Sequence, residues 1–218
     1  MMKLNFRITL FFLIIALSAN AQKGTFKKGF SVFSNSSYRN ISINIDNPNI
    51  NNATLKSSLN TLYVSKLSIG AEFVGEYFFK DNWSVQAGLN YLNKGWRLNP
   101  YYTFGVPFNT NSNFHSILVP VVLNNYLKLG KGEKLFLKSS AGFSADYIFK
   151  NNAHGGLSTF NKFGFSGIVA CGLNLRLKNG NDVALQPQWI YGLSNLNADN
   201  NFIQYHFSNI GIKTSYSF

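Results

Sequence analysis

The sequence predicts an all-β protein, an eight-stranded antiparallel up-and-down barrel that spans a membrane. Three observations indicate this fold: a targeting segment at the start, eight segments that alternate apolar and polar residues, and connections that are alternately short and long. Aromatic residues make up 16% of the chain and charged residues only 13%. Aromatic side chains favour strands, whereas the frequent Gly and Asn favour turns and loops. The composition therefore predicts a domain built almost entirely of strands.

The targeting segment has the three parts of a secretory signal peptide. Lys3 and Arg7 precede an apolar run at 8–17, and the tetrapeptide SANA, which ends at Ala21, has the small-x-small pattern of a cleavage site. The apolar run is too short to cross a bilayer of about 30 Å as a helix. Cleavage after Ala21 is expected to leave 22–218 as one domain, with 18 basic and 8 acidic residues and a net charge of +10. An uncleaved anchor is the alternative.

Period-two alternation predicts where the strands lie, because successive side chains of a strand point to opposite faces. The expected strands are 27–38, 61–79, 83–97, 114–129, 135–149, 163–176, 183–193 and 208–218. The connections after the second, fourth and sixth strands are short, at 80–82, 130–134 and 178–182. The other connections are long, at 39–60, 98–113, 151–162 and 194–201. The orientation of the fourth strand stays ambiguous because both of its rows are apolar.

Short turns, long outer loops and aromatic residues near the strand ends are typical of bacterial outer-membrane barrels. A closed barrel suits lipid because it pairs every backbone group without leaving an edge. A soluble barrel of lipocalin type, with the apolar row inside, is the alternative. The alternation alone does not show which row of side chains faces outward. The small polar residues of the second row favour a membrane barrel of OmpA/OmpX type, whose narrow interior they would fill. We expect outer-membrane localisation, with both ends of the mature chain in the periplasm.

Five segments between residues 83 and 218 form recognisable blocks. They are WSVQAGLNYLNKGWRL (83–98), ILVPVVLNNYL (117–127), KLFLKSSAGFSADYIF (134–149), NDVALQPQWIYGLSNL (181–196) and NIGIKTSYSF (209–218). These blocks resemble the PorT-like outer-membrane β-barrel family of Bacteroidetes, although Val119 precedes Pro120 where the family often has Ile. The resemblance implies a barrel of the cell envelope, not an activity. It also implies an aromatic C-terminal strand, with Tyr216 and Phe218 as the signal for the barrel-assembly machinery.

The charged members of the polar row are candidates for a network inside the barrel. They are Lys66, Glu72, Glu76, Lys138, Asp146, Arg176 and Lys213. An eight-stranded barrel is wide enough only for side chains, and buried charges need partners. The two glutamates are therefore expected to pair with Lys138, Arg176 or Lys213. This predicts a solid, salt-bridged interior, with a narrow ion path as the alternative.

The three histidines, His115, His154 and His206, are expected at the extracellular end, near Asp146 and Asp199. Enzymes with His and a nucleophile or carboxylate, and metal sites of three imidazoles, use such residues. No His lies four residues from another, and no Gly-x-Ser-x-Gly is present. We therefore predict no catalytic, metal or cofactor site. Whether these histidines converge is not decided by the sequence.

The predicted function is that of a non-enzymatic, monomeric barrel that anchors in outer-membrane lipid and displays loops for contact with an extracellular ligand or an envelope protein. The largest loops, 39–60 and 98–113, are rich in Asn, and the second carries aromatic residues suited to recognising sugars or proteins. These are Tyr101, Tyr102, Phe104 and Phe108. Nucleic acid is not an expected partner because the basic residues are dispersed; near strand ends they are expected to meet lipid phosphates. A small-solute channel and a lipid- or peptide-modifying enzyme at the rim are the alternatives.

Overall fold

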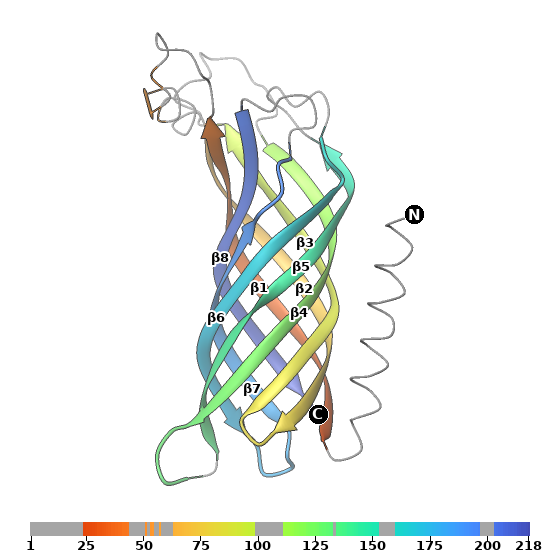
Figure 1. The fold of residues 1–218 in the computed structure, drawn as a ribbon, viewed down its shortest axis with the longest axis vertical. Helices are drawn as coiled ribbons and strands as arrows, with labels where there is room; N and C mark the ends of the chain where they lie inside the picture. The colour runs from red at the N-terminus through yellow and green to blue at the C-terminus, as the bar shows by residue number, and fades with distance from the viewer. Residues whose placement is uncertain are drawn as a thin grey trace.

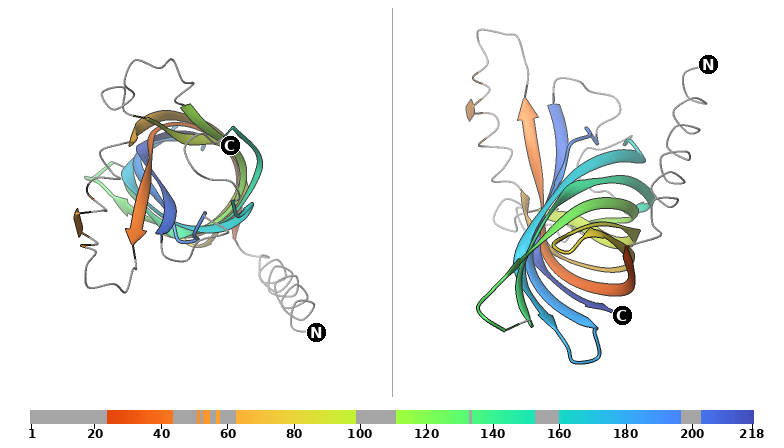
Figure 2. Two further views of the ribbon diagram at one scale, coloured as in Figure 1. Left: turned by 90° about the horizontal axis from the view of Figure 1, so that it is seen from above. Right: turned by 60° about the horizontal axis from the view of Figure 1, so that its bottom comes forward.

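The alternating segments form one sheet that closes on itself. The computed structural model describes residues 24–43, 51, 53, 54, 57, 63–98, 111–132, 134–152, 160–196 and 203–218. Its strands, in chain order, are β1 (Thr25–Ile43), β2 (Tyr63–Lys80), β3 (Trp83–Leu98), β4 (Asn111–Lys128), β5 (Leu135–Asn152), β6 (Phe163–Arg176), β7 (Asp182–Gly192) and β8 (Ile203–Ser217). Each pairs antiparallel with its sequence neighbours, and β1 also pairs with β8 (Figures 1 and 2). The predicted eight-stranded up-and-down barrel is confirmed.

The two ends of the barrel differ in their connections. The connections at 81–82, 129–134 and 177–181 lie at the same end as the C-terminus, which we call the turn end (Figure 1). Gly130 and Gly180 have φ values of 77° and 84° in two of these turns, a conformation that favours glycine. The opposite end, toward which β1 runs, is called the loop end. The predicted signal peptide lies outside the described residues. In the described part of the chain, no helix is long and apolar enough to cross a membrane.

Several strands are longer than the sequence pattern predicts. Residues 39–43, expected in a loop, continue β1, and β8 begins at Ile203 rather than at 208. β4 begins at Asn111, inside the expected loop 98–113, and β5 runs through Asn152. All these extensions lie at the loop end, where the outward row becomes polar and the alternation fades. The strands therefore continue beyond the apolar part of the barrel surface.

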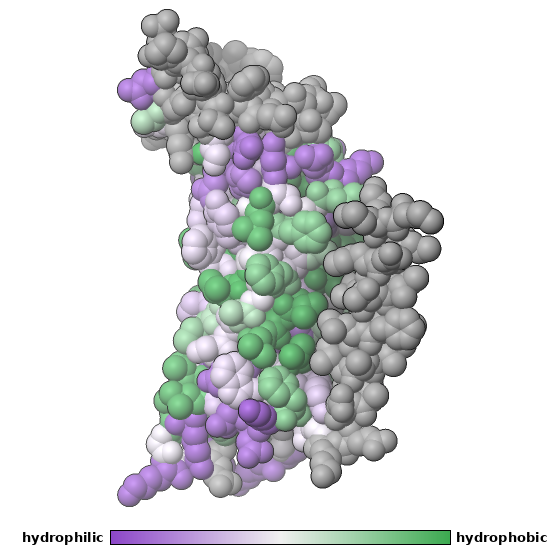
Figure 3. All heavy atoms as spheres, in the orientation of Figure 1, coloured by the Kyte–Doolittle hydropathy of each residue, from purple (hydrophilic) through white to green (hydrophobic). Residues whose placement is uncertain are grey.

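The apolar row of each strand faces outward and forms an apolar belt around the barrel. Large apolar side chains on all eight strands are exposed; Phe73 on β2 and Phe163 on β6, for example, are 77% and 75% exposed. The belt is bordered by hydrophilic residues toward both ends (Figure 3). A soluble barrel with its apolar row inside does not describe this molecule. The outward belt is the surface expected of a barrel surrounded by lipid.

The inward row is mostly polar, but it also contains apolar clusters that the sequence pattern does not predict. Phe33, Leu92 and Leu118 form one buried cluster, and Val122, Ile168 and Ile190 form another. Both clusters include a residue of β4, whose orientation was ambiguous in the sequence. The structure turns the row that contains Leu118 and Val122 inward and exposes Ile117 and Val119.

Gly172 on β6 is expected to be intolerant of even a methyl group. A Cβ there would lie 2.1 Å from the carbonyl oxygen of Leu185 and 2.6 Å from the Cα of Gln186, so the backbone of β7 would have to move. Overpacking of this kind costs about 1–3 kcal/mol. We expect Gly172→Ala to lower the free energy of unfolding by that amount in urea titrations of the barrel in lipid vesicles. Gly167→Ala on the same strand is the control, because a Cβ there meets nothing within 4 Å.

Candidate functional site

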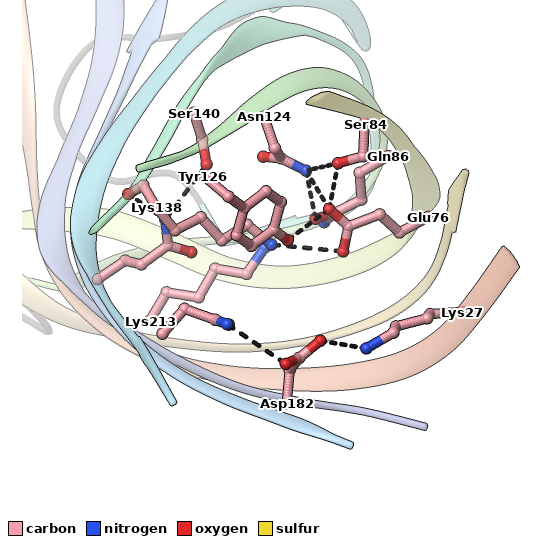
Figure 4. Close-up of polar contacts among 12 residues, drawn as sticks. Lys27, Glu76, Ser84, Gln86, Asn124, Tyr126, Lys138, Ser140, Asp182 and Lys213 are labelled. Carbon is pink, nitrogen blue, oxygen red and sulfur yellow. Dashed lines mark hydrogen bonds and ion pairs between the residues drawn. The ribbon is translucent and has the colours of Figure 1, made fainter. Parts of the chain in front are cut away.

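The interior of the barrel is organised in layers, and the layer nearest the turn end is centred on Asp182. Lys27 forms an ion pair with its carboxylate (Figure 4). Lys27 also donates a hydrogen bond to the carbonyl oxygen of Gly180, at 2.8 Å. Arg176 Nε donates to Asp182 Oδ1 at 3.3 Å, and Asn174 Nδ2 is 3.4 Å from the same oxygen. Arg176 was expected to meet a glutamate; it meets Asp182 instead, because β6 and β7 bring the two residues directly opposite each other.

The next layer is centred on Glu76, which β2 places in the lumen. Its Oε1 accepts hydrogen bonds from Ser84, from Asn124 Nδ2 at 2.8 Å and from the Tyr126 hydroxyl at 2.6 Å. Its Oε2 lies 3.5 Å from Lys138 Nζ (Figure 4). Glu76 is 2% and Lys138 5% exposed, so both charges are shielded from solvent. Side chains from four consecutive strands, β2 to β5, are therefore tied together through one carboxylate.

A third layer pairs Glu72 with Lys213 across the β1 strand that separates them. Two glutamines of β7 fill the space beside this pair: Gln186 Nε2 donates to Ser140 Oγ at 3.2 Å, and Gln188 Nε2 lies 3.3 Å from Asn35 Oδ1. Each glutamate of the lumen thus has one lysine partner.

Lys66, the remaining lysine of the predicted network, lies elsewhere. It is half-buried beside a register shift between Ser65 and Ile69, and it takes part in none of the ion pairs found in the described part of the chain. The ionic layers therefore form without it.

Toward the loop end, a buried ion pair lies next to a group of apolar side chains. Lys94 pairs with Asp146, and its Nζ lies 4.6 Å from the ring centroid of Phe207. The adjacent group, which we call the aromatic cap, consists of Trp96, Phe114, Ile148, Leu196 and Phe207.

Cationic and aromatic groups pack around the aromatic cap. The guanidinium carbon of Arg39 lies 5.3 Å from the Trp96 ring centroid and 4.5 Å from that of Tyr205. Such cation–π contacts are favourable where water is excluded. The aromatic cap therefore closes the loop end of the lumen with side chains from β3, β4, β5 and β8 and from the segment after β7.

These layers leave little space inside. Two cavities beside the ion pairs, one at Lys94 and Asp146 and one at Glu72 and Lys213, each have a volume of only about 20 Å³. A cavity of that volume holds about one water molecule. The arrangement is suited to rigidity: charges are neutralised in pairs, and apolar clusters lie between the ionic layers.

The two histidines that the structure describes lie far apart. His115 lies on β4 and His206 on β8, which are opposite strands of the closed barrel, and His154 lies outside the described residues, as does Asp199. Asp146 faces the lumen and pairs with Lys94. Among the residues that the structure describes, no group of three or more His, Cys, Asp or Glu side chains could hold a metal ion. The ring of His206 stacks on Tyr191, at 6.4 Å between centroids.

The architecture and the sequence point to the same class of protein. A family model described as "Outer membrane protein beta-barrel domain" matches residues 20–197. The chain belongs to this family. It is therefore an outer-membrane β-barrel protein, and its apolar belt is the surface that faces lipid. The match is to this broad family; the narrower resemblance to PorT-like proteins stays a prediction.

Solved structures of similar shape have very different sequences. Neisserial surface protein A is 10% identical, covers 90% of this chain and 100% of its own, and has a TM-score of 0.49. The outer membrane protein OprG from Pseudomonas aeruginosa is 12% identical, covers 89% and 95%, and has a TM-score of 0.47. Ail of Yersinia pestis, in complex with the heparin analogue sucrose octasulfate, is 14% identical, covers 88% and 99%, and has a TM-score of 0.39. No curated protein sequence matches the chain significantly.

Proposed function

We propose that this outer-membrane barrel is a non-enzymatic, monomeric protein that anchors in lipid and displays its long connections for contact with an extracellular ligand or an envelope partner. The observation that carries the proposal is the filled interior, with ionic layers toward the turn end and the aromatic cap toward the loop end. A barrel whose lumen is occupied by side chains presents its outer surface and its connections to other molecules. The function is therefore assigned to the connections at the loop end.

The proposal includes an orientation. Outer-membrane barrels have short periplasmic turns and longer extracellular loops, which puts the turn end in the periplasm and the loop end outside the cell. Cleavage after Ala21 would then leave the mature N-terminus in the periplasm, beside the C-terminus. The connection at 98–113 carries Tyr101, Tyr102 and Phe104, which lie outside the described residues. Aromatic rings give large contact areas at low cost in side-chain entropy, so they suit recognition of sugars or proteins.

The test combines conductance with binding. We expect the full chain to show only background conductance in planar bilayers, because buried ion pairs and the aromatic cap obstruct the lumen. Cells that display the full chain are expected to bind members of an immobilised oligosaccharide and envelope-protein panel. Replacing the aromatic residues of the 98–113 connection (Tyr101, Tyr102, Phe104 and Phe108) by Ser should reduce that binding at least several-fold, since large aromatic residues dominate contact energetics.

The control variant is Lys131→Ala at the turn end, which should bind like the unchanged chain. Both variants must show normal heat-modifiable migration in gels, so that lost binding is not lost folding. Single-channel currents above background would favour the channel instead. Equal binding by the loop variant, or chemical change of lipid A or peptide substrates during incubation, would contradict the proposed function.

A further inference from the structure

Acidic side chains are concentrated inside the barrel, whereas basic side chains lie both inside and outside. Of the acidic residues that the structure describes, Glu72, Glu76, Asp146 and Asp182 are buried in the lumen, each with a basic partner. The other, Asp81, is exposed in the turn between β2 and β3, at the turn end. The outward face near the loop end therefore carries no acidic residue in the described part of the chain, whereas Arg97 and Lys150 are exposed there.

A β-bulge turns Lys150 toward this outward face. Asp146 and Ile148 of β5 are buried, so unbroken alternation would point Lys150 into the lumen as well. The register shifts between His115 and Ser116: Ser116 pairs with Ile148, but His115 pairs with Lys150, so Phe149 is an extra residue. Bulges of this kind re-aim side chains. Lys150 consequently lies on the same outward face as His115. Ile117, two residues after His115 on β4, is exposed on this face.

Aromatic rings frame the histidine on that face. The His115 ring stacks on Tyr91, with 6.1 Å between centroids, and lies 6.2 Å from Phe149. The Tyr91 hydroxyl is 2.7 Å from His115 Nδ1. In the tautomer in which this hydroxyl donates to Nδ1, the Nε2–H is left to donate to another group. The bulge and the rings thus hold two nitrogen donors, one from His115 and one from Lys150, on neighbouring strands.

We propose that Tyr91, His115, Phe149 and Lys150 form a binding site for the phosphate group of a membrane lipid in the leaflet at the loop end. Positive charge and hydrogen-bond donors match a phosphate, and the outward face offers no described carboxylate to compete for them. The site is continuous with the apolar belt through Ile117, so its ligand must be compatible with lipid chains. A phosphorylated lipid meets both conditions. In the orientation proposed above, this leaflet is the outer one.

The experiment measures which lipids the full chain retains. The protein is placed in bilayer nanodiscs of phosphatidylcholine mixed with either bis-phosphorylated lipid A or the same lipid A without phosphates, and the lipids that stay bound are counted by native mass spectrometry. We expect preferential retention of the phosphorylated lipid. The double variant His115→Ala/Lys150→Ala should lower that retention on the order of tenfold, because it removes one cation and two donors near the membrane surface.

The matched control is Lys131→Ala/Lys178→Ala, which removes two exposed lysines at the turn end and should retain phosphorylated lipid normally. His115→Gln, which keeps a nitrogen donor, should retain more than His115→Ala. Equal retention of the two forms of lipid A, or unchanged retention by a double variant with normal heat-modifiable migration, would overturn the proposal. The site lies outside the 98–113 connection. A negative result for lipid retention is therefore distinguishable from a negative result for ligand binding by the loops.

Discussion

Glu76→Ala is expected to lower the free energy of unfolding by about 3–5 kcal/mol, the range for breaking a buried ion pair on one side. The variant would leave the ammonium group of Lys138 buried without its carboxylate, and it would remove the acceptor that Ser84, Asn124 and Tyr126 share. The measurement is a urea titration of the barrel in phospholipid vesicles, followed by tryptophan fluorescence. Heat-modifiable gel migration reports in parallel whether the barrel forms at all.

Two further variants test whether the loss of stability comes from the buried, unpaired charge rather than from removing any acidic residue. Asp81→Ala, in an exposed turn, should unfold at the same urea concentration as the unchanged chain. Glu76→Met/Lys138→Met removes both charges and keeps comparable volume, so it should recover the part of the lost stability that comes from the unpaired Lys138, since apolar replacement of a buried pair is often neutral. The part that comes from the donors of Ser84, Asn124 and Tyr126 should stay lost, because their shared acceptor is still absent. An unfolding midpoint for Glu76→Ala equal to that of the unchanged chain would show that the Glu76 layer does not stabilise the barrel.

The barrel itself could be predicted because lipid imposes a pattern on the sequence. Each strand must expose apolar side chains on one face, and the connections must differ between the two ends, so both signals are visible without a structure. The pattern fades where lipid no longer constrains the outward row. In β1, Tyr38, Asn40 and Ser42 occupy that row, so the sequence resembles a loop although the pairing with β8 continues to Ile43. The sequence pattern therefore ends β1 and β5 too early and begins β4 and β8 too late.

Parity predicts which face a charged residue belongs to, but it does not predict its partner. The pairs depend on the stagger between strands, which closes the barrel and sets which residues share a level. Arg176 shares a level with Asp182, a residue that the sequence pattern places in a turn. Lys94 has the same parity as Gln86 and could have been identified from that signal.

The aromatic cap as a cluster was not accessible by such reasoning. Alternation puts Trp96, Ile148 and Phe207 in the inward row, but it does not show that they meet, because the members of the cap come from four strands and from the segment after β7. Trp96 and Phe114, for example, meet with 5.0 Å between ring centroids only because β3 and β4 are neighbours at the loop end. Aromatic residues near strand ends also suggest a girdle facing lipid, which is the opposite orientation. The closed sheet shows that these rings face inward, as their alternation indicates, and that they meet in one cluster.

Deleting Phe218 is expected to reduce the amount of assembled barrel in the outer membrane several-fold. The backbone of Phe218 exchanges two hydrogen bonds with Lys28, at 3.0 and 2.8 Å, where β1 meets the end of the chain beyond β8. Its ring is 60% exposed and lies 6.1 Å from that of Tyr216, which packs on Phe30 of β1. Losing two backbone hydrogen bonds costs on the order of 1–3 kcal/mol, enough to change abundance in cells several-fold. The measurement is quantitative immunoblotting of heat-modifiable barrel in outer-membrane fractions.

Phe218→Ala separates two roles of Phe218: closing the barrel through its backbone, and recognition of its ring by the barrel-assembly machinery. This variant keeps both backbone hydrogen bonds with Lys28, so it should refold almost normally into lipid vesicles that contain no assembly machinery. If Tyr216 and Phe218 are the assembly signal that the sequence predicts, Phe218→Ala should still be depleted from outer membranes in cells. Phe79→Ala, which removes another exposed ring at the turn end, is the control and should assemble normally in both settings. Normal outer-membrane levels of the deletion variant would contradict both roles, whereas depletion of the deletion variant alone would assign Phe218 to closing the β1–β8 seam.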